Sequence, residues 1–223
     1  MSEHKNILLI FDFDGTLADT QPELDLALLE FSNANDLPHD PKKMAVGYVN
    51  PDVYDLGWGL PLSEQRPYLK AFNEYLRDVC AHDAKYMSAL FAGVEEFLQQ
   101  IQNDYICSII TARDRPSFLS IMNYHRLHDI FPHYRTSCCA RERGYKIKPQ
   151  ADAVHCLLTD LQQQPEKIIV IGDTTSDIGM AANANAKSIG VLWGAHDRHT
   201  LQEAGADAIA ESVVDLRDII ARL

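Results

Sequence analysis

Long apolar runs are scarce in this sequence. The first apolar run near the N-terminus, Ile7–Phe11, has only five residues and ends at Asp12. A membrane-spanning helix needs about 20 predominantly apolar residues, and a signal peptide needs a longer apolar stretch than this one. The sequence therefore predicts neither a signal peptide nor a membrane span, and we expect a cytoplasmic protein.

Paired cysteines are also lacking. The chain has five cysteines, an odd number, and none of them form a C-x-x-C motif. Such a pattern is typical of reduced thiols rather than of a disulfide framework. The adjacent Cys138 and Cys139 do not change this expectation, because disulfide geometry disfavours a bond between neighbours.

Positive charge is in short supply. The chain has 20 basic and 32 acidic residues, which gives a net charge of −12 and a pI near 5.1. This balance repels nucleic-acid backbones and anionic lipid surfaces, so we expect no nucleic-acid or membrane partner. It also repels phosphorylated small molecules. A phosphate site in this chain would need a metal ion or a well-placed lysine.

What is present is the composition of an ordinary globular protein. With 223 residues, of which 46% are hydrophobic and 23% charged, the chain can bury a substantial core. The length fits one large domain that carries a smaller insertion.

The segment that follows the first strand has a helical texture. Thr20 and Glu23 have the spacing of a capping box, and apolar residues then recur at helical intervals as far as Phe31. The stretches DLPHDPKK and GYVNPDVYDLGWGLPLS are loops between short helices. Residues 18–91 are therefore predicted to form a small inserted helical domain.

From about residue 93 the pattern changes to alternating helices and strands. GVEEFLQQIQ, PSFLSIMNYHRLHDIF and ADAVHCLLTDLQ read as helices, whereas YICSIITA, KIIVIGDT and SIGVLW read as strands. This alternation is typical of a mainly parallel sheet with right-handed crossovers. We predict an α/β protein in which a Rossmann-like core of residues 1–17 and 92–223 is flanked by helices, and the insertion 18–91 is a separate helical domain.

Chemically capable residues follow several of the predicted strands. Asp12 and Asp14 follow the first, Thr111 follows another, and Asp173 and Asp177 follow KIIVIG. In open α/β sheets the carboxyl ends of the strands form the ligand-binding edge, so these side chains should converge. Clustered carboxylates suit a hard divalent cation, and Mg²⁺ is typically held by few carboxylates together with substrate phosphate.

A lysine ahead of a helix completes the pattern. Lys148 lies in GYKIKPQ, where Lys146 is a competing candidate; the Lys-Pro pair favours Lys148, and Lys146 reads as a loop charge. An ammonium group placed there could neutralise both a carboxylate nucleophile and a phosphoryl oxygen.

Together these motifs resemble those of the haloacid dehalogenase superfamily. DFDGT after a buried strand, IITAR, KP at 148 and 149, and GDTTSD at 172 to 177 occur in the order of its four motifs. The helical insertion resembles the cap that follows the first motif in many members. GDTTSDIGMAANANAKSIGVLWGAHD with AGADA further resembles the phosphoglycolate phosphatase-like branch.

The resemblance implies a role for each motif residue. Asp12 would attack phosphorus to form an aspartyl phosphate, and Asp14 would act as general acid and then as base. Gly15, Thr111, Ala112 and Lys148 would bind the phosphoryl group. The metal ligands would be Asp12, Asp14 through its backbone carbonyl, Asp173 and Asp177, with Asp177 in direct contact or in support.

Other polar residues have simpler interpretations. Arg113 reads as a solvated charge. The histidine pairs His125 with His128 and His196 with His199 lack a recognisable third ligand for zinc. In the insertion, three residues could either close over a substrate or pack between helices: Tyr48, Asn50 and Trp58.

The function that these expectations favour is a Mg²⁺-dependent phosphatase that hydrolyses a small phosphomonoester, either a phosphoglycolate-like compound or a sugar phosphate, through an aspartyl phosphate. A phosphosugar mutase and a phosphonate hydrolase of the same superfamily remain as alternatives, and a non-catalytic phospho-aspartate regulator, such as a receiver domain, is disfavoured by the length of the insertion. A dehalogenase is disfavoured because it does not need the metal site. The phosphonate hydrolase would need a Schiff-base lysine in the insertion, where the candidates are Lys42, Lys43, Lys70 and Lys85. The oligomeric state is not specified by the sequence.

Overall fold

The computed structural model describes residues 6–38, 58, 60–161 and 164–223. Contacts divide the chain into two compact units. The larger unit comprises Met1–Asp19, Ala89–Arg115 and His125–Leu223, and the smaller unit comprises Thr20–Ser88 and Pro116–Tyr124.

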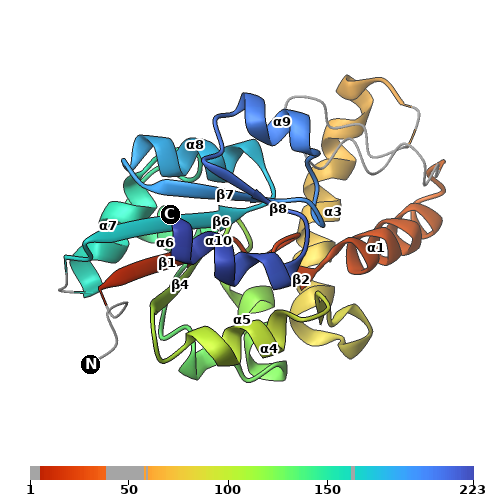
Figure 1. Ribbon diagram of the computed structural model, residues 1–223. Coiled ribbons are helices and arrows are strands. Elements are labelled where there is room, and N and C mark those ends of the chain that lie inside the picture. Colours follow the sequence, from red (N-terminus) through yellow and green to blue (C-terminus); the bar gives the residue numbers. More distant parts are fainter. Residues whose placement is uncertain (1–5, 39–57, 59, 162–163) are drawn as a thin grey trace. The chain divides into compact units, whose positions relative to one another are not determined.

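A six-stranded parallel sheet forms the centre of the larger unit (Figure 1). Its spatial order is β5-β4-β1-β6-β7-β8. The strands are β1 (Ile7–Phe11), β4 (Ile106–Ile110), β5 (His133–Arg135), β6 (Lys167–Gly172), β7 (Lys187–Val191) and β8 (Ala208–Ala210). The strand order reverses direction beside β1, which places the topological switch point next to the strand that precedes Asp12.

Helices cover both faces of this sheet. On one face, apolar side chains of β1, β4 and β6 pack against α7 (Asp152–Leu161) and α8 (Thr175–Asn183) in a buried cluster. On the other face, Phe11 packs edge-on against Phe97 of α4 (Val94–Ile101) and against Phe131. The described part of this unit also contains α6 (Ser137–Arg143), α9 (Arg198–Glu203), α10 (Leu216–Arg222) and two 3₁₀ turns, Leu127–Asp129 and Val213–Asp215. The predicted Rossmann-like α/β class is confirmed.

The register of the central strands explains why the motif residues meet. Phe11 of β1 pairs with Ile109 of β4 on one side and with Ile171 of β6 on the other. Because these strands are parallel and in step, Asp12 and Asp173, which follow within two residues, leave the sheet at the same edge.

Several elements do not follow the sequence-based expectation. The strands β5 and β8 have three residues each, which is too short for an alternating pattern to indicate them. A further pair, β2 (Ala18–Asp19) and β3 (Ala89–Leu90), is antiparallel and joins the two chain segments that flank the insertion. Residues 18–91 are predicted from the sequence to be helical, so the two short strands at the ends of this segment are a departure from that prediction.

The smaller unit contains α1 (Gln21–Ala34), α3 (Leu62–His82), a 3₁₀ turn at Ala84–Tyr86 and, by its contacts, residues 116–124 of α5 (Arg115–Tyr124). Trp58 is fully buried in its core, stacks on Phe31 and donates a hydrogen bond of 2.8 Å from Nε1 to the Ser32 hydroxyl. Of the two roles considered for Trp58, packing between helices is the one observed. Tyr48 and Asn50 lie outside the described residues.

The predicted capping box at the start of α1 is absent. Thr20 makes no side-chain cap hydrogen bond. Glu23 is instead buried, where its carboxylate accepts hydrogen bonds from the Ser88 hydroxyl and, at 3.8 Å, from the Cys80 thiol. A buried carboxylate has no access to water and needs hydrogen-bond donors from the protein, whereas water can accept hydrogen bonds from the free amides of an exposed helix end.

None of the helices in the described part of the chain is long and apolar enough to cross a bilayer.

Candidate active site

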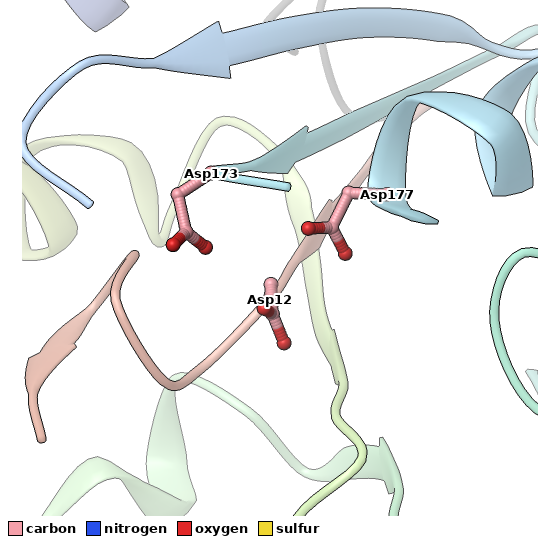
Figure 2. Close-up of side chains that lie close together, drawn as sticks. All are labelled: Asp12, Asp173 and Asp177. Atoms are coloured by element: carbon pink, nitrogen blue, oxygen red, sulfur yellow. The ribbon is translucent and has the colours of Figure 1, made fainter. Parts of the chain in front are cut away.

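Three buried aspartates form the centre of the site. Asp12 follows β1, Asp173 follows β6 and Asp177 lies in the first turn of α8. Figure 2 shows the three side chains close to one another. Each offers an oxygen, and these oxygens lie within 4.8 Å of one another. In the described part of the chain this is the one group of three acidic, histidine or cysteine side chains close enough to share a metal ion.

Lys148 lies within ion-pair distance of two of the aspartates. Its Nζ is 2.7 Å from Asp12 Oδ1 and 2.7 Å from Asp177 Oδ1. Burial lowers the pKa of Lys148, but the two carboxylates outweigh burial and hold that pKa above its usual value. The ammonium group therefore stays charged. Lys146, by contrast, is exposed, so the structure brings Lys148 and not Lys146 to the aspartates.

The charges in this cluster do not balance. Three carboxylates and one ammonium group leave a formal excess of two negative charges. Burial, together with repulsion from Asp177, raises the pKa of Asp12 well above its usual value and that of Asp173 to about 6. Oxygen ligands with an excess charge of minus two fit a hard divalent cation, which would remove this repulsion.

Asp173 is held by the loops around it. Its Oδ1 accepts a hydrogen bond of 2.9 Å from the Thr16 hydroxyl, and its Oδ2 accepts one of 2.8 Å from the Ala195 amide. Two glycines make room for the carboxylate. A Cβ on Gly15, which has φ of +76°, would lie 2.3 Å from Asp173 Oδ2, and a Cβ on Gly194 would lie 2.3 Å from Asp173 Cβ.

Asp177 combines a structural and an electrostatic role. Its Oδ2 accepts hydrogen bonds from the Thr174 amide at 3.1 Å and the Thr174 hydroxyl at 2.6 Å, which caps α8. Its Oδ1 faces Lys148. Gly172 allows this close approach, because a Cβ there would lie 2.3 Å from Asp177 Cγ. The Asp177 side chain therefore both caps the first turn of α8 and contributes a negative charge to the aspartate cluster.

Asp14 is set apart from the three-aspartate cluster. Its Oδ2 accepts a hydrogen bond of 3.2 Å from the Thr111 hydroxyl, and its Oδ1 lies 2.5 Å from Arg113 Nη1. The side chain of Asp14 is 32% exposed, whereas that of Arg113 is 10% exposed. The interpretation of Arg113 as a solvated charge is wrong, because this residue is mostly buried and ion-paired with Asp14. The carboxylate of Asp14 is not one of the clustered ligands in the described structure.

A cavity of about 70 Å³ adjoins Lys148. Thr111, Ala112 and Lys148 contribute to its lining, as do Arg135 and Tyr145. Two buried polar atoms, Arg135 Nε and Tyr145 Oη, have no hydrogen-bond partner among the residues that the structure describes. Since buried polar groups are normally paired, a polar ligand or ordered water would be well accommodated there.

The sequence did not indicate the segment after β7 as part of the site. Trp193 Nε1 donates a hydrogen bond of 3.0 Å to the Thr16 carbonyl, and the His196 amide donates one of 3.2 Å to the Asp173 carbonyl. The sequence pattern could have indicated this segment, because SIGVLW is a predicted strand, and a segment that follows a strand parallel to β6 leaves the sheet at the same edge. His196 Nδ1 accepts from the Thr175 amide at 3.0 Å, and burial lowers the pKa of His196.

Two of the candidate Schiff-base lysines, Lys70 and Lys85, lie in the described part of the chain, and both are near acidic side chains. Lys85 is 3.0 Å from Glu30 Oε2, and a hydrogen bond to Glu30 raises the pKa of Lys85. An amine nucleophile needs the opposite shift. Lys70 is exposed and lies 4.0 Å from Glu74. Lys42 and Lys43 lie outside the described residues.

Comparison with known proteins gives consistent matches along most of the chain. The family model described as haloacid dehalogenase-like hydrolase matches residues 9–191. A phosphoglycolate phosphatase from Vibrio vulnificus (strain CMCP6) is 24% identical over 99% of this chain and 98% of its own length. The pyrophosphatase PpaX from Bacillus mycoides is 20% identical over 96% of this chain and 97% of its own length.

A solved structure shares the fold. The crystal structure of a predicted phosphoglycolate phosphatase from Haemophilus somnus superposes with a TM-score of 0.77 at 21% identity, covering 96% of this chain and 97% of the other.

Proposed function

Because the chain belongs to the haloacid dehalogenase-like hydrolase family, we propose that it is a Mg²⁺-dependent phosphatase that hydrolyses a small phosphomonoester through a phosphorylated Asp12. The expected family is thus established, and the activity is our proposal. The observation that supports the activity most strongly is the buried cluster of Asp12, Asp173 and Asp177 with Lys148 paired to two of its members.

In the proposed first step an Asp12 carboxylate oxygen attacks phosphorus. The new Asp12–phosphorus bond forms as the ester bond breaks, and Asp14 gives its proton to the leaving oxygen. Lys148 fixes the orientation of the Asp12 carboxylate, because its Nζ is only 2.7 Å from Asp12 Oδ1. Its charge also compensates the phosphoryl oxygens when the substrate binds.

In the proposed second step water attacks the phosphorus, and the Asp12–phosphorus bond breaks to release phosphate and the free Asp12 carboxylate. Asp14 accepts the proton of that water. Arg113 and Thr111 hold the Asp14 carboxylate for both proton transfers. Thr111, Ala112 and Gly15 are the proposed phosphoryl-binding residues, and Thr111 and Ala112 both line the cavity beside Lys148.

Mg²⁺ is the cofactor we propose for the aspartate cluster. When bound, it would supply positive charge to the phosphoryl oxygens and neutralise the excess charge of the carboxylates. Asp12 and Asp173 are the proposed direct ligands with the Asp14 carbonyl, and Asp177 would contact the ion or support its ligands. The pKa of Asp173, which burial and then repulsion from Asp177 raise, supports this assignment, because a cation would compensate both effects.

A small phosphorylated metabolite is the proposed substrate class. The likeness to phosphoglycolate phosphatases over nearly the whole chain favours a phosphoglycolate-like compound, and the pyrophosphatase relative adds diphosphate as a second compound to test.

The domain assignment is also our proposal. Residues 1–17 and 92–223 form the proposed catalytic core, and residues 18–91 form the proposed cap. The cap would hinge near residues 17–21 and 88–93 and exclude water before the chemical step.

The test is phosphate release from phosphoglycolate, sugar phosphates, diphosphate and nucleotides, with Mg²⁺ and with a chelator. We expect turnover that requires Mg²⁺, with Asp12→Asn inactive and an exposed substitution, Asp129→Asn, fully active. Release that persists in the chelator or in Asp12→Asn would contradict the proposal. Conversion of a sugar phosphate to its isomer without phosphate release would identify a mutase, and release from a phosphonate alone would identify a phosphonate hydrolase.

A further inference from the structure

Cysteine thiols and arginine side chains gather at the start of α6 in the larger unit. Cys139 Sγ lies 3.4 Å from Arg115 Nη2, which donates a hydrogen bond to it, and 3.5 Å from the Thr136 hydroxyl. Cys138 Sγ accepts hydrogen bonds from the Arg115 amide at 3.4 Å and from Arg141 Nη2 at 3.1 Å. These two thiols are thus surrounded by cationic and amide donors, which is the environment of reactive rather than inert cysteines.

Another cysteine of the same unit provides a contrast. Cys107 lies within β4, and burial raises the pKa of its thiol to about 12. For Cys139, burial also raises the pKa, but hydrogen bonds from Thr136 and Arg115 outweigh it and bring the pKa below the ordinary value. Cys139 is nearly buried, with 8% of its surface exposed, so we expect only a small oxidant to reach its sulfur.

The cysteine cluster is connected to the proposed catalytic residues by backbone contacts. The Ser137 amide, one residue before Cys138, donates a hydrogen bond of 3.1 Å to the Arg113 carbonyl. Arg113 is the residue whose guanidinium lies 2.5 Å from Asp14 Oδ1. Arg115 contacts both thiols, so the loop of residues 111–115 is bound to the start of α6 at two points.

We propose that Cys139 is a site of reversible oxidation by hydroperoxides, activated by the Arg115 guanidinium, and that its oxidation slows turnover by displacing the loop of residues 111–115. In this reaction the thiolate sulfur attacks one peroxide oxygen and the O–O bond breaks. The sulfur is oxidised to a sulfenic acid, and the peroxide is reduced to hydroxide or alkoxide, which is neutralised by a proton from the buffer. One molecule of a small thiol then displaces the sulfenic oxygen as water and forms a mixed disulfide, and a second molecule releases the cysteine and leaves with the first as their disulfide. The effect on turnover rests on the proposed phosphatase function, whereas the oxidation itself does not.

The site is tested on the intact, folded protein with hydrogen peroxide. After timed exposure the protein is denatured and alkylated, and the loss of alkylation at each cysteine is measured by peptide mass spectrometry, with and without dithiothreitol. We expect Cys139 to be oxidised at least about tenfold faster than Cys107 and to be recovered by the thiol. Equal rates at both cysteines, or oxidation at Cys138 in place of Cys139, would overturn the assignment.

Matched variants test the role of Arg115. Arg115→Gln should slow oxidation of Cys139 by about fivefold or more, because the donor to its sulfur is lost. Arg141→Gln removes a guanidinium that contacts Cys138 instead and should leave Cys139 oxidation unchanged. Arg115 also pairs with Glu142, so Glu142→Gln, which keeps the guanidinium, separates activation from a merely structural effect. The activation by Arg115 is refuted if Cys139 is oxidised at the wild-type rate in Arg115→Gln. It is also refuted if Glu142→Gln slows Cys139 oxidation as much as Arg115→Gln does.

Turnover is the second readout. Peroxide should lower phosphate release by wild type severalfold and reversibly, and Cys139→Ser should resist it. If Cys139→Ser is inhibited as strongly as wild type, the link to turnover is wrong even if the oxidation is real. If wild type releases no phosphate from any substrate, the proposed function and the link to turnover both fail, while the oxidation rates still decide the modification site.

Discussion

The substitution Asp173→Asn should stabilise the metal-free protein at alkaline pH while abolishing its response to Mg²⁺. Asparagine has nearly the same shape as aspartate, and its amide can still accept from the Ala195 amide and pair with the Thr16 hydroxyl. What it removes is a carboxylate that burial and Asp177 make costly to ionise. The change therefore separates the electrostatic cost of the cluster from its packing.

The magnitude follows from the pKa of Asp173. A value of about 6 in the folded protein, against 3.8 as the usual value, means that the folded state binds the proton more tightly than the unfolded state. The contribution of Asp173 to the free energy of unfolding is then highest below about pH 4, falls as the pH rises to about 6, and stays low above that pH. The full loss is about 3 kcal/mol, because each tenfold difference in proton affinity between the folded and unfolded states is about 1.4 kcal/mol. The variant should be more stable than wild type by up to this amount at pH 8 and equally stable near pH 4.

The assay is urea unfolding with a chelator at pH 8 and at the lowest pH where unfolding remains reversible. Adding Mg²⁺ at 100 times its dissociation constant should stabilise wild type by about 2.7 kcal/mol and leave the variant unchanged. Asp129→Asn, at an exposed position, is the control for the change of charge. If metal-free Asp173→Asn is less stable than wild type at pH 8, the carboxylate is well compensated and the reasoning about excess charge is wrong.

Three further substitutions test the site residue by residue. Arg113→Gln should lower kcat by about 10- to 100-fold with little change in KM, because Asp14 loses the partner that positions it for proton transfer; unchanged kcat would remove Arg113 from the site. Lys148→Met should abolish measurable turnover and lower the free energy of unfolding, measured in urea, by about 3 kcal/mol or more, because Asp12 and Asp177 lose the charge that pairs with them. A variant as stable as wild type would contradict this. Gly194→Ala should weaken Mg²⁺ binding, because the added Cβ would lie 2.3 Å from Asp173 Cβ and displace that proposed ligand. The measurement is the rise in Tm that Mg²⁺ causes; the same rise as in wild type would mean that the loop moves to accommodate the methyl group at little cost.

The sequence predicted the central sheet and most of the cluster because these depend on local patterns. The apolar runs of β1, β4 and β6 indicate buried strands, and parallel strands bring their carboxyl ends to one edge. Asp12, Asp173 and Asp177 therefore could be expected to meet, and Lys148 could be expected to join them. Asp12 and Asp173 depend on the strand ends, whereas Asp177 lies in the first turn of α8 and Lys148 precedes α7.

What the sequence missed depends on side-chain direction and long-range contacts. Arg113 resembles a surface charge in sequence, and only the fold shows that its guanidinium turns inward to Asp14. Glu23 has the spacing of a capping residue, but Ser88, 65 positions away, holds it instead. The Trp193 contact with Thr16 joins residues 177 positions apart. Neither spacing nor composition carries information about such contacts.

The most direct test of the central claim is to trap the phosphorylated enzyme. The best substrate found in the phosphate-release assay, labelled in its phosphoryl group, is mixed with the protein and Mg²⁺, quenched in acid within the first turnover, and digested. The account predicts a label on the peptide that contains Asp12, absent from Asp12→Asn and sensitive to hydroxylamine as an acyl phosphate is. Turnover without any label on that peptide, together with activity in Asp12→Asn, would contradict it.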